Sequence, residues 1–265
     1  MKKVDGHIHT PFCPHGSSDS FREYIERAIS LDYTHLTFTE HAPLPAGFKD
    51  TTPDQDSGMS EEDVSIYFDT IEELKEIYKH RITIRAGLEV DYIEGFEEES
   101  SDFLNSWGER LDDSILSVHF LQYKNKWDCL DFSHEVFHSM IDRYGSVDSV
   151  HAHYYRTVLK SIEADLGRFK PNRIGHITLV KKFQKLYPAS QPFTKEIQRI
   201  LEAVAARELE LDYNGAGVIK PHCGESYPPK VIIEHARSLG IKTVYGSDAH
   251  SASGLDQGRH AMNLL

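Results

Sequence analysis

The chain has 265 residues, of which 39% are hydrophobic and 27% charged, and its formal net charge is −13. This length suits one large α/β domain or two small ones, with a sizeable core. The acidic balance argues against nucleic acid as a main partner, because phosphate backbones select basic surfaces. No apolar run approaches the roughly 20 residues of a membrane span, and the N-terminus has no signal-peptide h-region. The three cysteines are far apart and form no CxxC, which argues against disulfides or a thiolate zinc site and favours the cytoplasm.

Strand-like and helix-like segments alternate along the whole chain. Ser20 and Glu23 form a capping box that opens the first helix, and the Pro-, Gly- and Asp-rich segment 41–60 is long enough to be a functional loop. In chain order, we predict strand 2–9, helix 20–30, strand 35–41, helix 60–79, strand 82–92, helix 95–110, strand 113–120, helices 133–143 and 148–166, a short strand within 172–179, helix 194–207, strand 209–214, helix 228–239 and strand 242–250.

Alternating strands and helices indicate a parallel sheet. Seven such units in one chain of this length favour a barrel-like α/β fold, with an open doubly wound sheet as the alternative. No GxGxxG follows the first predicted strand, which weakens a dinucleotide-binding interpretation.

Metal-ligating side chains recur where the predicted strands end. His7 and His9 alternate on a strand and therefore project to the same side, so the pair can chelate one ion. The C-terminal ends of parallel strands are where sites assemble in α/β folds. Histidines with a few carboxylates suit zinc, manganese or iron, and the candidates are too many for one ion, so a cluster of two or three metals follows. The candidates are His7, His9, His15, His41, Glu89, His119, His176, Asp248 and His250.

The ordered set "DGHIHT", "TEH", "GLE", "SVH", "GH" and "SDAH" resembles the polymerase and histidinol phosphatase (PHP) family of metal-dependent phosphoesterases. The flanking words "HTPFCPHG", "TEHAPLP", "GLEVDY", "DDSILSVHF" and "RIGHITLV" resemble its histidinol-phosphate phosphatase branch in particular. The resemblance covers nearly the whole chain and implies a single domain over residues 1–265, folded as a distorted (β/α)7 barrel that holds up to three divalent transition metals.

The resemblance also implies how the ligands are shared. One metal would be held by His7, His9, Glu89 and Asp248; a second by Glu89 as a bridge, His119 and His176; and a third by His15, His41 and His250. Many family members have Asp where this chain has His15, which makes the third site more neutral here.

Such a cluster would be strongly positive inside an acidic protein and would attract a phosphate monoester. Two metals about 3.5–4 Å apart can share a hydroxide and clamp the phosphate oxygens during in-line attack. Glu89, Asp248 and His250 are then the catalytic residues, and Arg156 and Lys220 are candidates to bind the outer phosphate oxygens. Tyr155 is a candidate to stack on the substrate's ring.

The expected reaction is hydrolysis of L-histidinol phosphate to L-histidinol and phosphate in histidine biosynthesis. Another small phosphate ester is the alternative within the family. Glu40 is expected to orient a ligand or support the second shell. The sequence indicates neither an oligomeric state nor the acid that protonates the leaving group.

Two other motifs carry weaker hypotheses. "HEVFH" matches the zincin motif through His134, Glu135 and His138, but its histidines lie opposite the apolar face formed by Phe132, Val136, Phe137, Met140 and Ile141, so we expect them to face solvent. Cys13 could be a thiolate ligand, although a small residue that shapes the loop is the preferred interpretation.

Overall fold

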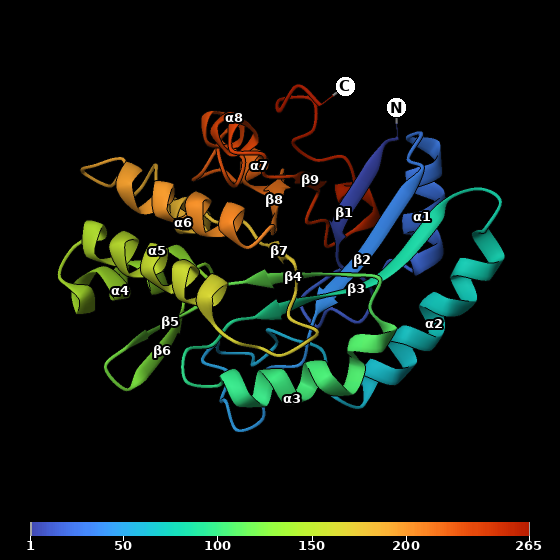
Figure 1. The fold of residues 1–265 in the computed structure, drawn as a ribbon, viewed down its shortest axis with the longest axis horizontal. Coiled ribbons are helices and arrows are strands. Elements are labelled where there is room, and N and C mark those ends of the chain that lie inside the picture. The colour runs from blue at the N-terminus through green and yellow to red at the C-terminus, as the bar shows by residue number, and fades with distance from the viewer. Residues whose placement is uncertain (1, 265) are drawn as a thin grey trace.

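Seven parallel strands curl into a nearly closed barrel (Figure 1). The computed structural model describes residues 2–264. The barrel closes where the segment after the last strand meets the first: the backbone N–H of His9 donates to the carbonyl of Ala249 at 3.0 Å, and that of Asp248 donates to the carbonyl of His7 at 2.8 Å. This closure confirms the predicted barrel over the open sheet. The order around the sheet is β1 (Val4–Ile8), β2 (His35–His41), β3 (Thr83–Asp91), β4 (Asp113–Ser117), β7 (Arg173–Ile174), β8 (Glu210–Asn214) and β9 (Thr243–Gly246).

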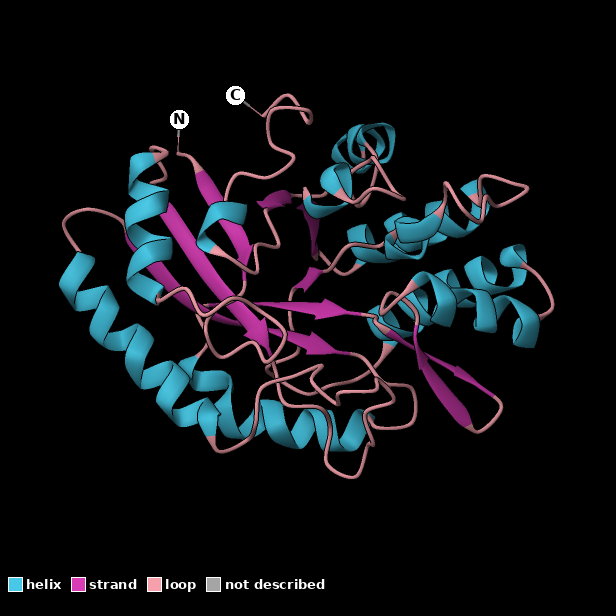
Figure 2. Cartoon of the chain, turned by 180° about the vertical axis from the view of Figure 1, so that it is seen from behind, coloured by secondary structure: helices cyan, strands magenta, loops and turns pink. Residues whose placement is uncertain are grey.

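Helices cover the outside of the barrel, as Figure 2 shows from behind. The predicted capping box is present, with the Ser20 side chain accepting from the Glu23 N–H. Within the described residues, no helix is both long and apolar enough to cross a bilayer. The helices are α1 (Phe21–Ser30), α2 (Asp63–Tyr78), α3 (Glu97–Trp107), α4 (His134–Tyr144), α5 (Val147–Glu163), α6 (Thr194–Ala206), α7 (Ala216–Ile219) and α8 (Lys230–Ser238), with short 3-10 turns η1 (Gly108–Arg110), η2 (Leu179–Phe183) and η3 (Ala252–Gly254).

One antiparallel hairpin, β5 (Phe120–Tyr123) and β6 (Lys126–Cys129), was not predicted. The predicted strand 113–120 ends at Ser117, and the chain then turns into this hairpin. Phe48 packs edge-to-face on Phe120 and on Trp127, with ring centroids 5.1 and 5.8 Å apart. The hairpin therefore anchors the long loop 41–60 over one side of the barrel.

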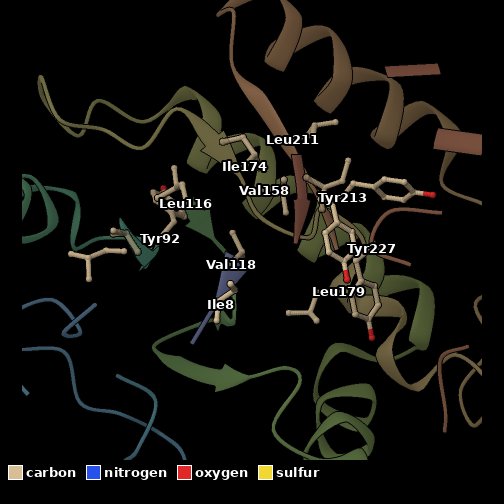
Figure 3. Packing of buried hydrophobic residues seen from close by; sticks show 14 of the residues in the cluster. Ile8, Tyr92, Leu116, Val118, Val158, Ile174, Leu179, Leu211, Tyr213 and Tyr227 are labelled. Carbon is tan, nitrogen blue, oxygen red and sulfur yellow. The ribbon is translucent and has the colours of Figure 1, made fainter. Parts of the chain in front are cut away.

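The core fills the space between strands and helices. Figure 3 shows Leu116 of β4, Ile174 of β7 and Leu211 of β8 among its buried side chains. Arg173 is also fully buried, and its Nη2 donates to Asp113 Oδ2 at 2.8 Å. A Cβ at Gly6 would lie 2.2 Å from Arg173 Nη1, so only glycine fits beside this guanidinium.

Candidate metal centre

A pocket of about 500 Å³ opens at the C-terminal ends of the strands. Predicted ligands from five separate segments line it: His15, His41, Glu89, His119, Asp248 and His250. His7, His9 and His176 lie beneath them and are buried. The ends of parallel strands therefore meet at one rim, as the sequence predicts.

Glu89, at the end of β3, lies at the centre of the cluster and its side chain is 1% exposed. Its Oε2 is 3.2 Å from His7 Nε2 and 3.2 Å from His41 Nδ1. Its Oε1 is 2.9 Å from His176 Nε2 and 3.8 Å from His119 Nε2. Each oxygen thus faces a different set of histidines, which is the arrangement that a bridging carboxylate requires.

Asp248 completes the group around His7 and His9. Its Oδ1 is 3.1 Å from His9 Nε2 and 3.8 Å from His7 Nε2. Asn214 Nδ2 donates to the other carboxylate oxygen at 3.0 Å. The backbone of Asp248 is left-handed, with φ of 55°. This conformation is uncommon for a residue with a side chain and occurs often at functional sites.

Four groups of side chains bring their ligand atoms within 4.8 Å of one another, which is close enough to share an ion. Two of them reproduce the expected first and second sets, apart from Asp248. His15 is in none of the groups; it is exposed, and its ring centroid is 5.2 and 5.1 Å from those of His41 and His250. The groups are His7, His9 and Glu89; Glu89, His119 and His176; His41, Asp91 and His119; and His9, Cys13, His41 and His250.

Buried carboxylates fix the orientation of several ligand rings. His7 Nδ1 lies 2.8 Å from Asp212 Oδ2, and His119 Nδ1 lies 2.8 Å from Asp91 Oδ1. His9 Nδ1 lies 3.1 Å from Glu40 Oε1, the orienting contact expected of Glu40. Such partners hold the Nδ1 proton, so each Nε2 is left to bind a metal. Asp212 and Asp91 were not predicted, because neither follows a recognisable metal motif in the sequence.

Unpartnered nitrogens in the cluster fit a metal ion. Within residues 2–264, His7 Nε2 and His41 Nδ1 are buried and have no hydrogen-bond partner, although both lie near Glu89. A buried polar atom without a partner costs about 1–3 kcal/mol. A divalent ion between these nitrogens and the carboxylate would satisfy them, and imidazole with carboxylate suits zinc, manganese or iron.

The pKa values of the buried groups in this cluster depend strongly on the charges of their neighbours. Burial alone would raise the pKa of Glu89, but His7, His41 and His119 hold it well below its usual range. Burial alone would lower the pKa of His9, but Asp248 and Glu40 raise it to about 9. Without metal, protons thus balance the buried carboxylates, and metal binding must release protons.

A partly buried lysine that sequence reasoning missed also reaches the pocket. Lys182, on η2, donates to the carbonyl of Asp131 at 2.7 Å and to its Oδ2 at 2.9 Å. Burial would lower the pKa of Lys182, but Asp131 raises it. Both residues line the pocket, as does the predicted Lys220. Lys182 follows the candidate ligand His176 by a few residues in the sequence, and this proximity was the signal that could have indicated a place in the pocket.

Two predicted substrate residues are not brought to this pocket. Arg156 is exposed on α5 and is outside the pocket lining. Tyr155 is buried against Phe193, with ring centroids 5.5 Å apart, and lines a different cavity. The reason is helical phase: successive residues on α5 are about 100° apart, so one side chain packs on α6 while the next faces solvent. The structure therefore brings neither predicted side chain into the lining of the metal pocket.

The zincin motif forms no site among the described residues. The His134 side chain is 45% exposed and Glu135 70% exposed, and His138 is exposed as well. The solvent-facing orientation expected of these histidines is confirmed. Phe132, however, is not on the buried face of α4: it precedes the helix, is 41% exposed and lines the metal pocket.

Comparisons of sequence and of structure relate the chain to known proteins. Residues 5–216 match the model of the PHP domain family. The chain is 46% identical over 254 residues to the histidinol-phosphatase of Bacillus subtilis, which covers 95% of both chains. A Listeria monocytogenes structure assigned as a histidinol phosphatase superposes with a TM-score of 0.94 at 40% identity, covering 98% of this chain and 99% of that one. The histidinol phosphate phosphatase of Lactococcus lactis, solved with zinc, L-histidinol and phosphate, superposes with a TM-score of 0.70 at 21% identity, covering 99% and 93%.

Proposed function

The chain belongs to the PHP domain family, and from this premise we propose that it is a histidinol-phosphatase, which hydrolyses L-histidinol phosphate to L-histidinol and phosphate. The observation that carries the proposal is the position of Glu89, whose two carboxylate oxygens face separate histidine sets at the base of an open pocket. The extensive identity to the Bacillus subtilis enzyme supports the choice of substrate.

Two or three divalent transition metals are the proposed cofactors. His7, His9, Glu89 and Asp248 would hold the first, and Glu89, His119 and His176 the second, while His41 and His250 contribute to the third. When bound, such ions lower the pKa of water towards about 7, so that a nucleophile forms at neutral pH, and they neutralise phosphate charge. The protein would supply the spacing through the bridge of Glu89 and through the carboxylates of Asp212, Asp91 and Glu40, which orient the histidine rings.

The walls of the pocket suit the rest of the substrate. Lys182 and Lys220 place positive charge beside the cluster, where the outer phosphate oxygens would lie. Phe132 offers an apolar, partly exposed ring for the imidazole. Asp131 and Asp56 offer carboxylates for the cationic amine.

Hydrolysis of another small phosphate ester is the alternative, since the same metal geometry would serve it. The test is phosphate release by the zinc- or manganese-loaded protein from L-histidinol phosphate and from p-nitrophenyl phosphate. We expect a much larger kcat/KM for L-histidinol phosphate. Equal values would refute the named substrate and leave a general phosphatase, whereas no release from either ester would refute the phosphatase.

A further inference from the structure

Cys13 lies among the histidines of the third metal group. Its sulfur lies within 4.8 Å of ligand atoms of His9, His41 and His250. Tetrahedral zinc with ligands at about 2.0–2.3 Å brings donor atoms to such separations. Cys13 is buried, with 4% exposure, whereas His15, the ligand expected here, is exposed. The thiol therefore points towards the cluster rather than towards solvent.

The backbone of the loop holds Cys13 in this position. The N–H of Cys13 donates to the carbonyl of Thr10 at 3.0 Å, and that of Gly16 donates to the carbonyl of Cys13 at 3.1 Å. A Cβ at Gly16 would lie 3.0 Å from the Cβ of Cys13, so the turn is tightly packed against this side chain. Two consecutive turns thus fix the thiol before any metal binds.

The other two cysteines behave differently. Cys129 Sγ donates to Asp131 Oδ1 at 3.5 Å, and Cys223 Sγ donates to the carbonyl of Glu225 at 3.4 Å. Both are ordinary buried thiols with oxygen acceptors, and neither belongs to a group of candidate metal ligands in residues 2–264. Cys13 is the cysteine whose sulfur lies close to the ligand atoms of several histidines.

We propose that Cys13 is a thiolate ligand of the metal ion held by His41 and His250. As the metal–sulfur bond forms, the S–H bond breaks and its proton passes to bulk water. A thiolate makes this site softer than the two centred on Glu89. The third ion should then be zinc, cobalt(II) or iron(II) in preference to manganese or magnesium, even where the other two positions accept manganese.

This inference rests on the metal centre of the proposed function, so the experiment separates the two. Metal-free protein is titrated with cobalt(II), and the bound metal is counted while the near-ultraviolet absorption is recorded. Thiolate coordination gives a sulfur-to-cobalt charge-transfer band, which histidine and carboxylate ligands do not. The variants are Cys13→Ser and, as a matched control for a buried cysteine, Cys223→Ser. Circular dichroism establishes that each variant folds.

We expect the band in the wild type and in Cys223→Ser and its loss in Cys13→Ser, with about a tenfold or greater loss of affinity for one ion per chain. A wild type that binds cobalt(II) fully without this band overturns the role of Cys13 and leaves the centre standing. Persistence of the band in Cys13→Ser overturns it as well. A wild type that binds no cobalt(II) contradicts the centre itself. If Cys13→Ser does not fold, the presence or absence of the sulfur-to-cobalt band in the wild-type protein tests the proposal by itself.

Discussion

Replacing Glu40 with glutamine removes a buried charge beside the candidate metal ligands and leaves the volume of the side chain almost unchanged. The Glu40 side chain is fully buried and contacts four polar groups. Its Oε2 accepts from the N–H of Thr10 at 2.7 Å and from the Thr10 hydroxyl at 2.5 Å. Its Oε1 accepts from the N–H of His41 at 2.9 Å and lies 3.1 Å from His9 Nδ1.

The expected losses of stability and of metal affinity follow from this geometry. A glutamine has one carbonyl oxygen, so its amide N–H₂ must face either the Thr10 N–H or the His41 N–H, both of which are donors. One buried backbone donor loses its acceptor, at about 1–3 kcal/mol, and the remaining bonds lose their charge assistance, at roughly 1 kcal/mol more. The free energy of unfolding of the metal-free protein should fall by about 2–4 kcal/mol. Because His9 loses its orienting charge, metal affinity should fall about 10–100-fold.

Urea unfolding of the metal-free protein and competition with a chelating dye measure the two effects. Glu76→Gln is the control, because Glu76 is 76% exposed and pairs with Lys79 at the surface. Its free energy of unfolding should change by less than about 0.5 kcal/mol. If Glu40→Gln matches this control in both stability and metal affinity, the orienting role assigned to Glu40 is wrong.

Three further predictions test other parts of the molecule. Changing His134 and His138 together to alanine should leave kcat/KM within about twofold, because both face solvent; a collapse in phosphate release would instead support a zincin site. Lys182→Met should lower kcat/KM by about tenfold or more while metal content stays unchanged, because a charge-assisted contact to phosphate is worth about 1.5–3 kcal/mol; an unchanged kcat/KM would exclude this contact. Burial, with the charge of Lys181, lowers the pKa of His151 to about 4. His151 then binds a proton more readily in the unfolded chain than in the folded one. Its contribution to the free energy of unfolding is therefore complete above about pH 6.5 and is lost as the pH falls towards 4. The free energy of unfolding of the wild type should therefore fall by about 3 kcal/mol more than that of His151→Leu between pH 7 and pH 4, and parallel pH profiles would contradict the shift.

Local sequence signals were enough to bring most of the candidate metal ligands to one rim of the barrel. His7 and His9 are fixed by strand alternation, and Glu89 by the end of a long β-branched strand. The parallel order of the strands follows from their alternation with helices, which places their ends at one rim. The periodicity of the sequence was therefore sufficient to predict the barrel and the clustering of the candidate ligands at one rim.

Residues positioned by tertiary contacts could not be predicted in the same way. Strand β7 has only two residues, Arg173–Ile174, because the chain leaves the sheet shortly before the candidate ligand His176. The β5–β6 hairpin depends on aromatic packing against the distant loop 41–60. The pairing of Lys182 with Asp131 spans 51 residues, and no local pattern reports such a contact. Cys13 was interpreted from its neighbours in sequence, whereas its neighbours in space are histidines.

The bridging position of Glu89 is the central claim, and metal content tests it most directly. Wild-type and Glu89→Gln protein would be loaded with zinc, freed of unbound metal, and assayed for zinc per chain and for phosphate release from L-histidinol phosphate. We predict two or three ions and rapid release in the wild type, and the loss of two ions together with nearly all activity in the variant. Full zinc occupancy in Glu89→Gln would contradict the bridge.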